Sequence, residues 1–166
     1  MGEFTLQLRS HQLTVNEVGW SVWESVETTQ TIRGSRLAII VCDMWDQHWS
    51  RGAAERVDQM APKMNEVLGV ARSRGAAILH APSSTLDFYA KSPARQRMIS
   101  LPALDVPDPR EMPDPPLPID DSDGGSDTGE TTTASVWTRQ HPAIEIDEAA
   151  DGISDDGEEI YRYIKH

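Results

Sequence analysis

The stretch Leu37-Ala38-Ile39-Ile40-Val41-Cys42-Asp43 decides the fold of this chain of 166 residues. Six consecutive apolar residues, rich in β-branched side chains, are typical of a strand that is buried on both faces in a parallel sheet. The run ends abruptly at Asp43. A carboxylate directly after a buried strand is costly to bury unless it has a partner or a chemical task. We therefore expect a parallel strand that carries Asp43 at its carboxyl end.

A helix and a second strand are predicted to follow. Between residues 55 and 74, apolar side chains recur every three or four positions, which predicts an amphipathic helix. Pro62 lies inside this span, so the helix either begins or bends there. Residues 76–81 then predict a second short strand, which Pro82 stops. The strand, helix and strand together have the size of a right-handed βαβ crossover.

The rest of the chain predicts a weaker third strand at residues 135–139 and a closing helix at residues 155–166. Asp155 and Glu158 have the spacing of a capping box at the start of that helix. In an α/β unit, a helix is followed by another strand. We therefore expect an α/β domain with a parallel sheet that is incomplete at its C-terminus.

Two segments lie outside this pattern. Residues 1–36 predict an N-terminal arm, in which Trp20 and Trp23 stand three apart, as on one helical face, and pack onto the domain. Residues 37–166 form the α/β domain, with an insertion at about residues 100–134. Seven of the eleven prolines lie between Pro102 and Pro118, and an acidic Ser-, Gly- and Thr-rich run follows. This composition is typical of an extended, flexible surface segment.

The charge of the chain excludes some classes of partner. Its 15 basic and 27 acidic residues give a net charge of −12, and residues 101–166 alone carry 4 basic and 17 acidic residues. Because nucleic acids and anionic membrane surfaces attract positive charge, we expect neither as a partner. No apolar run is long enough to span a bilayer, and residues 1–20 lack the apolar core of a signal peptide. We expect a cytoplasmic protein.

Three polar residues end the three expected strands: Asp43, His80 and Arg139. Ligands of open parallel sheets bind outside the carboxyl ends of the strands, which makes all three candidate site residues. Asp43 would act on a ligand, or would instead cap a helix or join a salt bridge. His80 would be a general base or a pocket residue, or a hydrogen-bonded structural residue.

Other side chains near Asp43 could serve either a functional or a structural role. Trp45 and Trp49 could form the wall of a pocket or belong to the core, and His48 lies beside them. Cys42 precedes Asp43 on the strand, so its side chain would point to the opposite face, into packing.

The sequence predicts no metal site and no cofactor. Asp46, His48, His80 and Asp87 are ligand types for zinc or iron, but their spacing matches no metal motif. The acidic run at residues 121–130 imitates part of a calcium loop, but the prolines before it forbid the entering helix. A calcium-responsive module is the weakest interpretation.

Several segments resemble the isochorismatase-like cysteine hydrolases, which include nicotinamidases and N-carbamoyl amidohydrolases. The segments are LAIIVCDMWDQHW (residues 37–49), the helix with Pro62, AAILHAPSST (76–85), VWTRQHPAIEI (136–146) and DGISDDGEEIYRYI (151–164). The resemblance implies a three-layer α/β/α, Rossmann-like sandwich with a parallel sheet, and an Asp–Lys–Cys triad. In such a triad the aspartate takes the thiol proton and the thiolate attacks a small amide.

The resemblance assigns roles residue by residue. Asp43 matches the family aspartate, whereas Arg139 or Thr138 stands where the family has lysine. Arg139 keeps the positive charge but cannot give up a proton. The family cysteine would follow residue 166, so we expect this chain alone to be inactive.

The function implied is hydrolysis of a small-molecule amide or related C–N bond. Asp43 and Arg139 would be catalytic, and Trp45, His48 and His80 would contact the substrate. The alternative is a non-catalytic binding or oligomerisation module. Its open sheet edge would then bind a partner, which could be a second copy of the chain.

Overall fold

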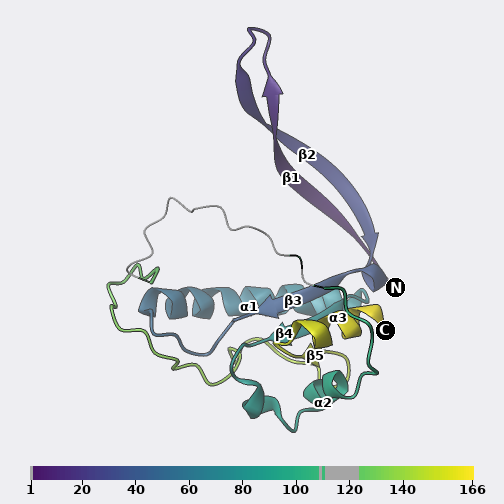
Figure 1. Cartoon of the computed structure of the whole chain (residues 1–166), viewed down its shortest axis with the longest axis vertical. Coiled ribbons are helices and arrows are strands. Elements are labelled where there is room, and N and C mark those ends of the chain that lie inside the picture. Colours follow the sequence, from purple (N-terminus) through teal and green to yellow (C-terminus); the bar gives the residue numbers. More distant parts are fainter. Residues whose placement is uncertain (1, 109, 111–123) are drawn as a thin grey trace.

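The computed structural model describes residues 2–108, 110 and 124–166, and it is a mixed α/β structure (Figure 1). A parallel sheet has the strand order β3-β4-β5, and an antiparallel pair is formed by β1 and β2. The strands are β1 (Glu3–Val15), β2 (Ser21–Arg33), β3 (Ala38–Cys42), β4 (Ala77–Ala81) and β5 (Gly152–Ile153). The helices are α1 (Arg51–Ser73), α2 (Pro93–Ile99) and α3 (Gly157–Lys165), with short 3-10 turns at Gly34–Arg36 and Leu86–Tyr89.

The predicted strand–helix–strand unit is present as β3, α1 and β4. The two strands pair in parallel, with Ala38 opposite Ala77 and Val41 opposite His80. The two strands, α1 and the segments next to them enclose a core of buried apolar residues: Val41, Met44, Ala61, Leu68, Ala71, Ala76, Ile78 and Ile144. This packing places the carboxyl ends of β3 and β4 side by side, where the sequence predicted a site.

The strand β3 is less buried than expected. It pairs with β4 on one side and lies at an edge of the sheet, so that only Val41 of its five residues is buried. The expectation that Cys42 is a buried packing residue is wrong, because its side chain is exposed. A strand with one free edge has no neighbour to cover that side.

The helix α1 begins at Arg51, four residues earlier than expected, and Pro62 lies inside it. The alternative that the helix begins at Pro62 is therefore wrong. Gly75 follows the helix with a φ of 91°, the left-handed conformation that commonly ends helices. None of the helices in the described part of the chain is both long enough and apolar enough to cross a membrane.

The predicted third strand at residues 135–139 is not a strand. The third strand is instead β5, whose two residues pair with Leu79 and His80 of β4. The segment before Gln140 joins the end of β3 through a single antiparallel bridge between Trp45 and Gln140. A strand of two residues is too short to produce a periodic pattern, so sequence analysis could not find it.

The closing helix α3 is present, but its cap differs from the expectation. Asp156, not Asp155, is the N-cap residue, and its carboxylate accepts hydrogen bonds from the backbone N–H groups of Glu158 and Glu159. Asp155 accepts instead from the N–H of Ser84. The helix is tied to α2 by an ion pair between Arg95 and Glu159.

The N-terminal arm is a β-hairpin, so the helical interpretation of Trp20 and Trp23 is wrong. The strands β1 and β2 pair antiparallel along thirteen residues each and project away from the domain (Figure 1). Trp20 and Trp23 are 71% and 69% exposed, so they do not pack on the domain. The hairpin is attached at its base, where the N–H of Gly2 donates to the carbonyl of Arg74 and Phe4 lies under the Arg74 guanidinium.

Part of the predicted insertion packs on the first turn of α1. Residues 109 and 111–123 lie outside the described residues, and they include the first three residues of the calcium-like run, 121–123. After them, the Thr128 hydroxyl accepts a hydrogen bond from the N–H of Gly52 at 3.0 Å, and Asp127 pairs with Arg56. Hydrogen bonds from Thr128 and Ser126 lower the pKa of Glu130 to about 2. The negative charge of this segment therefore lies at the positive end of the α1 dipole.

Candidate functional site

The chain leaves β3 through a strained residue. Asp43 has a φ of 51°, in the left-handed region that non-glycine residues rarely adopt. Its own N–H donates to the carbonyl of Ala81, and its Oδ1 accepts from the N–H of Ser83, both at 3.1 Å. These two bonds fix the carboxylate across the carboxyl ends of β3 and β4. Backbone strain of this kind is concentrated at functional sites, which makes Asp43 a candidate on structural grounds.

Asp43 lies at a small cavity of about 160 Å³ between the end of β3 and the first turns of α1. The cavity is lined by Asp43, Trp45, Gln47, His48, Ala53, Ala54 and Val57. Three of the predicted site residues, Asp43, Trp45 and His48, are therefore brought together. Pockets for drug-sized ligands measure roughly 300–1,000 Å³, so this cavity suits only a small molecule.

Aromatic rings form one wall of the cavity. Trp45 stacks on Trp137 with ring centroids 4.3 Å apart, and His48 stacks on Trp137 at 5.6 Å. The Trp45 indole N–H donates to the carbonyl of Ser83, and the His48 Nδ1 accepts from the N–H of Ser50. Because Nδ1 accepts, the proton of a neutral His48 ring lies on Nε2. Sequence analysis missed Trp137, which it assigned to a strand.

Arg139 lies near the cavity but does not line it. Its guanidinium lies 5.4 Å from the centre of the Phe88 ring, and its Nε is 4.0 Å from Asp46. Burial by itself would raise the pKa of Asp46, but hydrogen bonds from Thr138 and Arg139 outweigh it and lower the pKa. Arg139 is thus held by Asp46, and it is not among the residues that line the cavity with Asp43.

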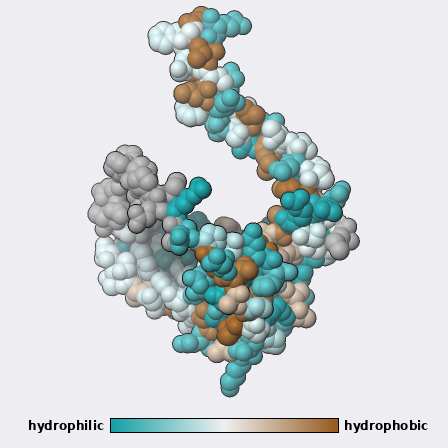
Figure 2. All heavy atoms as spheres, turned by 45° about the vertical axis from the view of Figure 1, so that its right-hand side comes forward, coloured by the Kyte–Doolittle hydropathy of each residue, from teal (hydrophilic) through white to brown (hydrophobic). Residues whose placement is uncertain are grey.

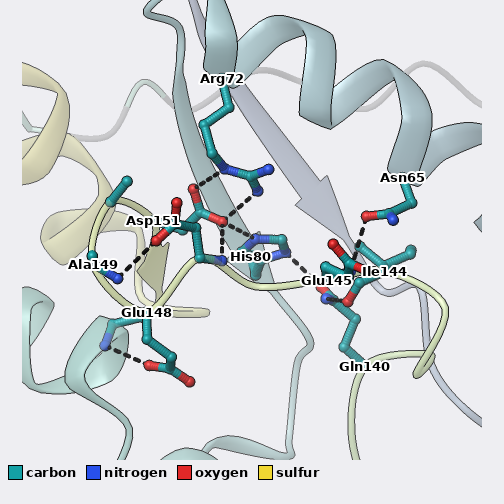
Figure 3. A network of polar contacts seen from close by, with 12 residues as sticks. Asn65, Arg72, His80, Gln140, Ile144, Glu145, Glu148, Ala149 and Asp151 are labelled. Carbon is teal, nitrogen blue, oxygen red and sulfur yellow. Dashed lines mark hydrogen bonds and ion pairs between the residues drawn. The ribbon is translucent and has the colours of Figure 1, made fainter.

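His80 belongs to a separate, buried network (Figure 3). The ring is 0% exposed, with Nδ1 2.8 Å from Gln140 Oε1 and Nε2 3.1 Å from Asp151 Oδ2. Arg72 of α1 donates two hydrogen bonds to the same Asp151 carboxylate, at 2.9 and 2.6 Å. His80 is therefore not among the residues that line the cavity. This arrangement fits the alternative of a hydrogen-bonded structural histidine.

Both ring nitrogens of His80 face oxygen atoms of the network. The Gln140 amide nitrogen donates to the carbonyl of Ile144, so its oxygen faces His80 Nδ1. Burial by itself would raise the pKa of Asp151, but hydrogen bonds from His80 and Arg72 lower it to about 2. Sequence analysis did not select Arg72, Gln140 or Asp151, since no local pattern marks them.

No family model, curated protein or solved structure matches this chain. Residues 2–108, 110 and 124–166 contain no group of three or more His, Cys, Asp or Glu side chains that could hold a metal ion.

Proposed function

We propose that the cavity beside Asp43 is the carboxylate half of an isochorismatase-like hydrolase site for a small amide or related C–N bond. The single observation that carries the proposal is the strained, solvent-facing Asp43 carboxylate at a small cavity, beyond the end of a parallel strand. The proposal includes a Rossmann-like α/β/α sandwich, of which β3, α1 and β4 are one crossover unit.

Asp43 would act as the proton acceptor. Its Oδ1 is held by the N–H of Ser83, and the cavity offers the carboxylate no cationic partner among the described residues. The carboxylate is thus placed to take a proton from a nucleophile. Trp45 and His48 would position a flat amide, and Arg139 would contribute positive charge near the rim.

The nucleophile would not come from the described residues of the cavity. Cys42 is exposed but lines a different groove, between β3 and α1. The function proposed for this chain alone is therefore binding of a small amide without turnover.

The binding can be tested by titrating nicotinamide and an N-carbamoyl amino acid into ¹⁵N-labelled protein. We expect chemical-shift changes at Asp43, His48 and the Trp45 indole, and their loss in Asp43→Asn. Asp87→Asn, at an exposed carboxylate, is the matched control and should bind like the native chain. No shift with either compound would overturn the proposal. Hydrolysis that depends on Asp43 would overturn the expected lack of turnover.

A second candidate function, a binding or oligomerisation module, is favoured by a different observation. An apolar groove of about 570 Å³ runs along the free edge of β3 and the adjoining face of α1. Exposed apolar patches on a protein surface can mark interaction sites. The mass of the chain in solution, measured by size-exclusion chromatography with light scattering, tests this function: self-association supports it, and a monomer at all concentrations speaks against it.

A further inference from the structure

The end of the N-terminal hairpin carries a cluster of exposed apolar side chains, which we name the tip cluster. Its members are 55–74% exposed: Leu13, Val15, Val18, Trp20 and Trp23. Leu13 and Trp23 are directly opposite each other on the two strands, so their side chains share a face. Figure 2 shows hydrophobic residues along the arm up to its end.

The hairpin has little support from the rest of the chain. Within the described part of the chain, its contacts with the domain lie at its base, around Gly2, Phe4 and Arg74. An isolated two-stranded hairpin is at best marginally stable in water, and it gains stability from further packing. Residues 11–25 contain two glutamates and neither Lys nor Arg, so nucleic acid and anionic lipid are poor partners. The tip cluster therefore fits an apolar protein surface.

The same chain carries such a surface, which we name the β3–α1 groove. It is lined almost entirely by apolar side chains: Ile39, Ile40, Val41, Cys42, Met44, Met60, Lys63, Met64, Val67 and Leu68. The groove is open to solvent, because Ile40 of β3 is 42% exposed, and Met60 and Val67 of α1 are 51% and 52% exposed. A volume of about 570 Å³ is ample for aromatic side chains.

We propose that two copies of the chain assemble by exchanging hairpins, so that the tip cluster of each copy fills the β3–α1 groove of the other. The hairpin is anchored beside Arg74 and its thirteen-residue strands extend about 40 Å. That reach takes the tip away from the groove of its own copy. A two-fold arrangement uses both surfaces twice, as isologous dimers do.

The tip clusters supply much of the area that a stable dimer needs. Two tryptophans about 70% exposed leave about 300 Å² of apolar surface to bury, and the three aliphatic side chains add about 200 Å². The exchange uses two tips, so the tips alone would bury about 1,000 Å² in the dimer, and the surfaces of the two grooves add to this. A typical stable interface buries about 1,600 Å² in total. This inference is independent of the hydrolase proposal, because neither surface includes Asp43.

Light scattering on the full chain tests the exchange. We expect the native chain to have about twice its 18.4 kDa mass. Trp20→Ser with Trp23→Ser should give a monomer, and so should Val67→Glu, which places a charge in the groove at an exposed helix position. Gln12→Ser on the hairpin and Gln59→Glu on α1 are matched controls that should remain dimeric.

Mixing the two monomeric variants distinguishes this dimer from other dimers. In the mixture, the intact tip of Val67→Glu can enter the intact groove of the tryptophan variant, so partial dimer formation should return. Hairpin-to-hairpin or groove-to-groove pairing would show no such rescue. A native monomer, a dimer that survives both variants, or a mixture without rescue overturns the proposal.

A covalent test uses the single cysteine of the chain. Cys42 lines the groove and is exposed, so Val18→Cys on the tip should bring two thiols from different copies together. Two thiols lose two protons and two electrons to an added oxidant and form one disulfide. We expect a covalent dimer from Val18→Cys that is lost when Cys42→Ser is added. A crosslink that persists in the double variant overturns the assignment of the tip to the groove.

Discussion

At the scale of single residues, Asp151 connects more of the domain than its place in an irregular loop suggests. It accepts hydrogen bonds from Arg72 of α1, from His80 of β4 and from the N–H of Asp147. Its side chain is 1% exposed. A carboxylate in this position stabilises the fold only while it is ionised, which makes stability dependent on pH.

We predict that stability falls in acid through Asp151. The folded state lowers the pKa of Asp151 from 3.8 to about 2, so the unfolded chain binds the proton first as pH decreases. The group contributes about 2 kcal/mol above pH 4, and this contribution disappears as pH falls from 4 to 2. In urea titrations, Asp151→Asn should be less stable than the native chain at pH 7, and the gap should close near pH 2.

The control for this prediction is Asp87→Asn, which removes an exposed carboxylate with no resolved role. It should follow the native stability at every pH. A gap between the native chain and Asp151→Asn that stays constant from pH 7 to pH 2 would show that the ionised carboxylate does not stabilise the network.

A second prediction concerns Gly34, where the hairpin joins the domain. A Cβ at this position would lie 2.0 Å from the backbone carbonyl oxygen of Arg74, and a backbone atom cannot move aside easily. Gly34→Ala should therefore lower the free energy of unfolding by about 1–3 kcal/mol. Gly69→Ala, on α1 with open space around it, should instead raise stability by up to about 1 kcal/mol. Equal effects of the two substitutions in urea unfolding would contradict this reasoning.

At the scale of elements, α1 is central, because it lines the cavity near its first turns and the groove further along. Its N-cap residue, Ser50, makes no side-chain capping bond. The hydroxyl of Thr128, which lies within the acidic insertion, accepts from the N–H of Gly52 instead. A residue more than seventy positions away therefore does what a local cap does in most helices.

We predict that Thr128→Ala destabilises α1 at its first turn. The substitution leaves the Gly52 N–H without its acceptor and should cost about 1 kcal/mol. Hydrogen exchange at Gly52 should accelerate, while exchange at the end of the helix stays as it is. Thr132→Ala, an exposed threonine of the same segment, is the control. Unchanged exchange at Gly52 would show that Thr128 does not cap the helix.

At the scale of the whole molecule, a small α/β domain carries a long hairpin, and the contacts between the two among the described residues lie near the base of the hairpin (Figure 1). We predict that the backbone amides of residues 11–25 exchange quickly in dilute solution and slowly at concentrations where the mass doubles. The reason is that the tip is solvated in a monomer and covered in the exchanged dimer. Amides of Ile78 and Leu79, which are at most 1% exposed, should be slow throughout.

The monomeric variant Trp20→Ser with Trp23→Ser provides the control for this measurement. Its tip amides should exchange quickly at every concentration. Fast exchange of the native tip in a sample that is fully dimeric would place the dimer interface elsewhere on the molecule.

Some secondary-structure elements could be predicted from the sequence, and others could not. Apolar runs and helical spacing predicted β3, α1 and β4, and with them the position of Asp43 beyond a strand end. They failed for β5, which is too short to have a period, and for the segment before Gln140, which meets the end of β3 by one bridge. They also failed for the hairpin, where three-residue spacing of Trp20 and Trp23 suggested a helix.

For the site, the sequence predicted Asp43, Trp45 and His48, and these three residues line one cavity. They do so because all three lie within a few residues of the same strand end. The sequence also predicted His80 and Arg139 as site residues, but neither of them lines that cavity. His80 is paired with Asp151, and Arg139 is held by Asp46. Which polar side chains meet depends on partners up to about ninety residues away, and local patterns contain no information about them.

The order of residues along the chain thus determined the local elements, because periodicity and strand ends are properties of neighbouring residues. Tertiary structure alone decided that His80 is buried in a charged network, that a distant threonine caps α1 and that the tip of the hairpin is left in solvent. The physical reason is that burial and pairing are settled by packing between elements far apart in sequence.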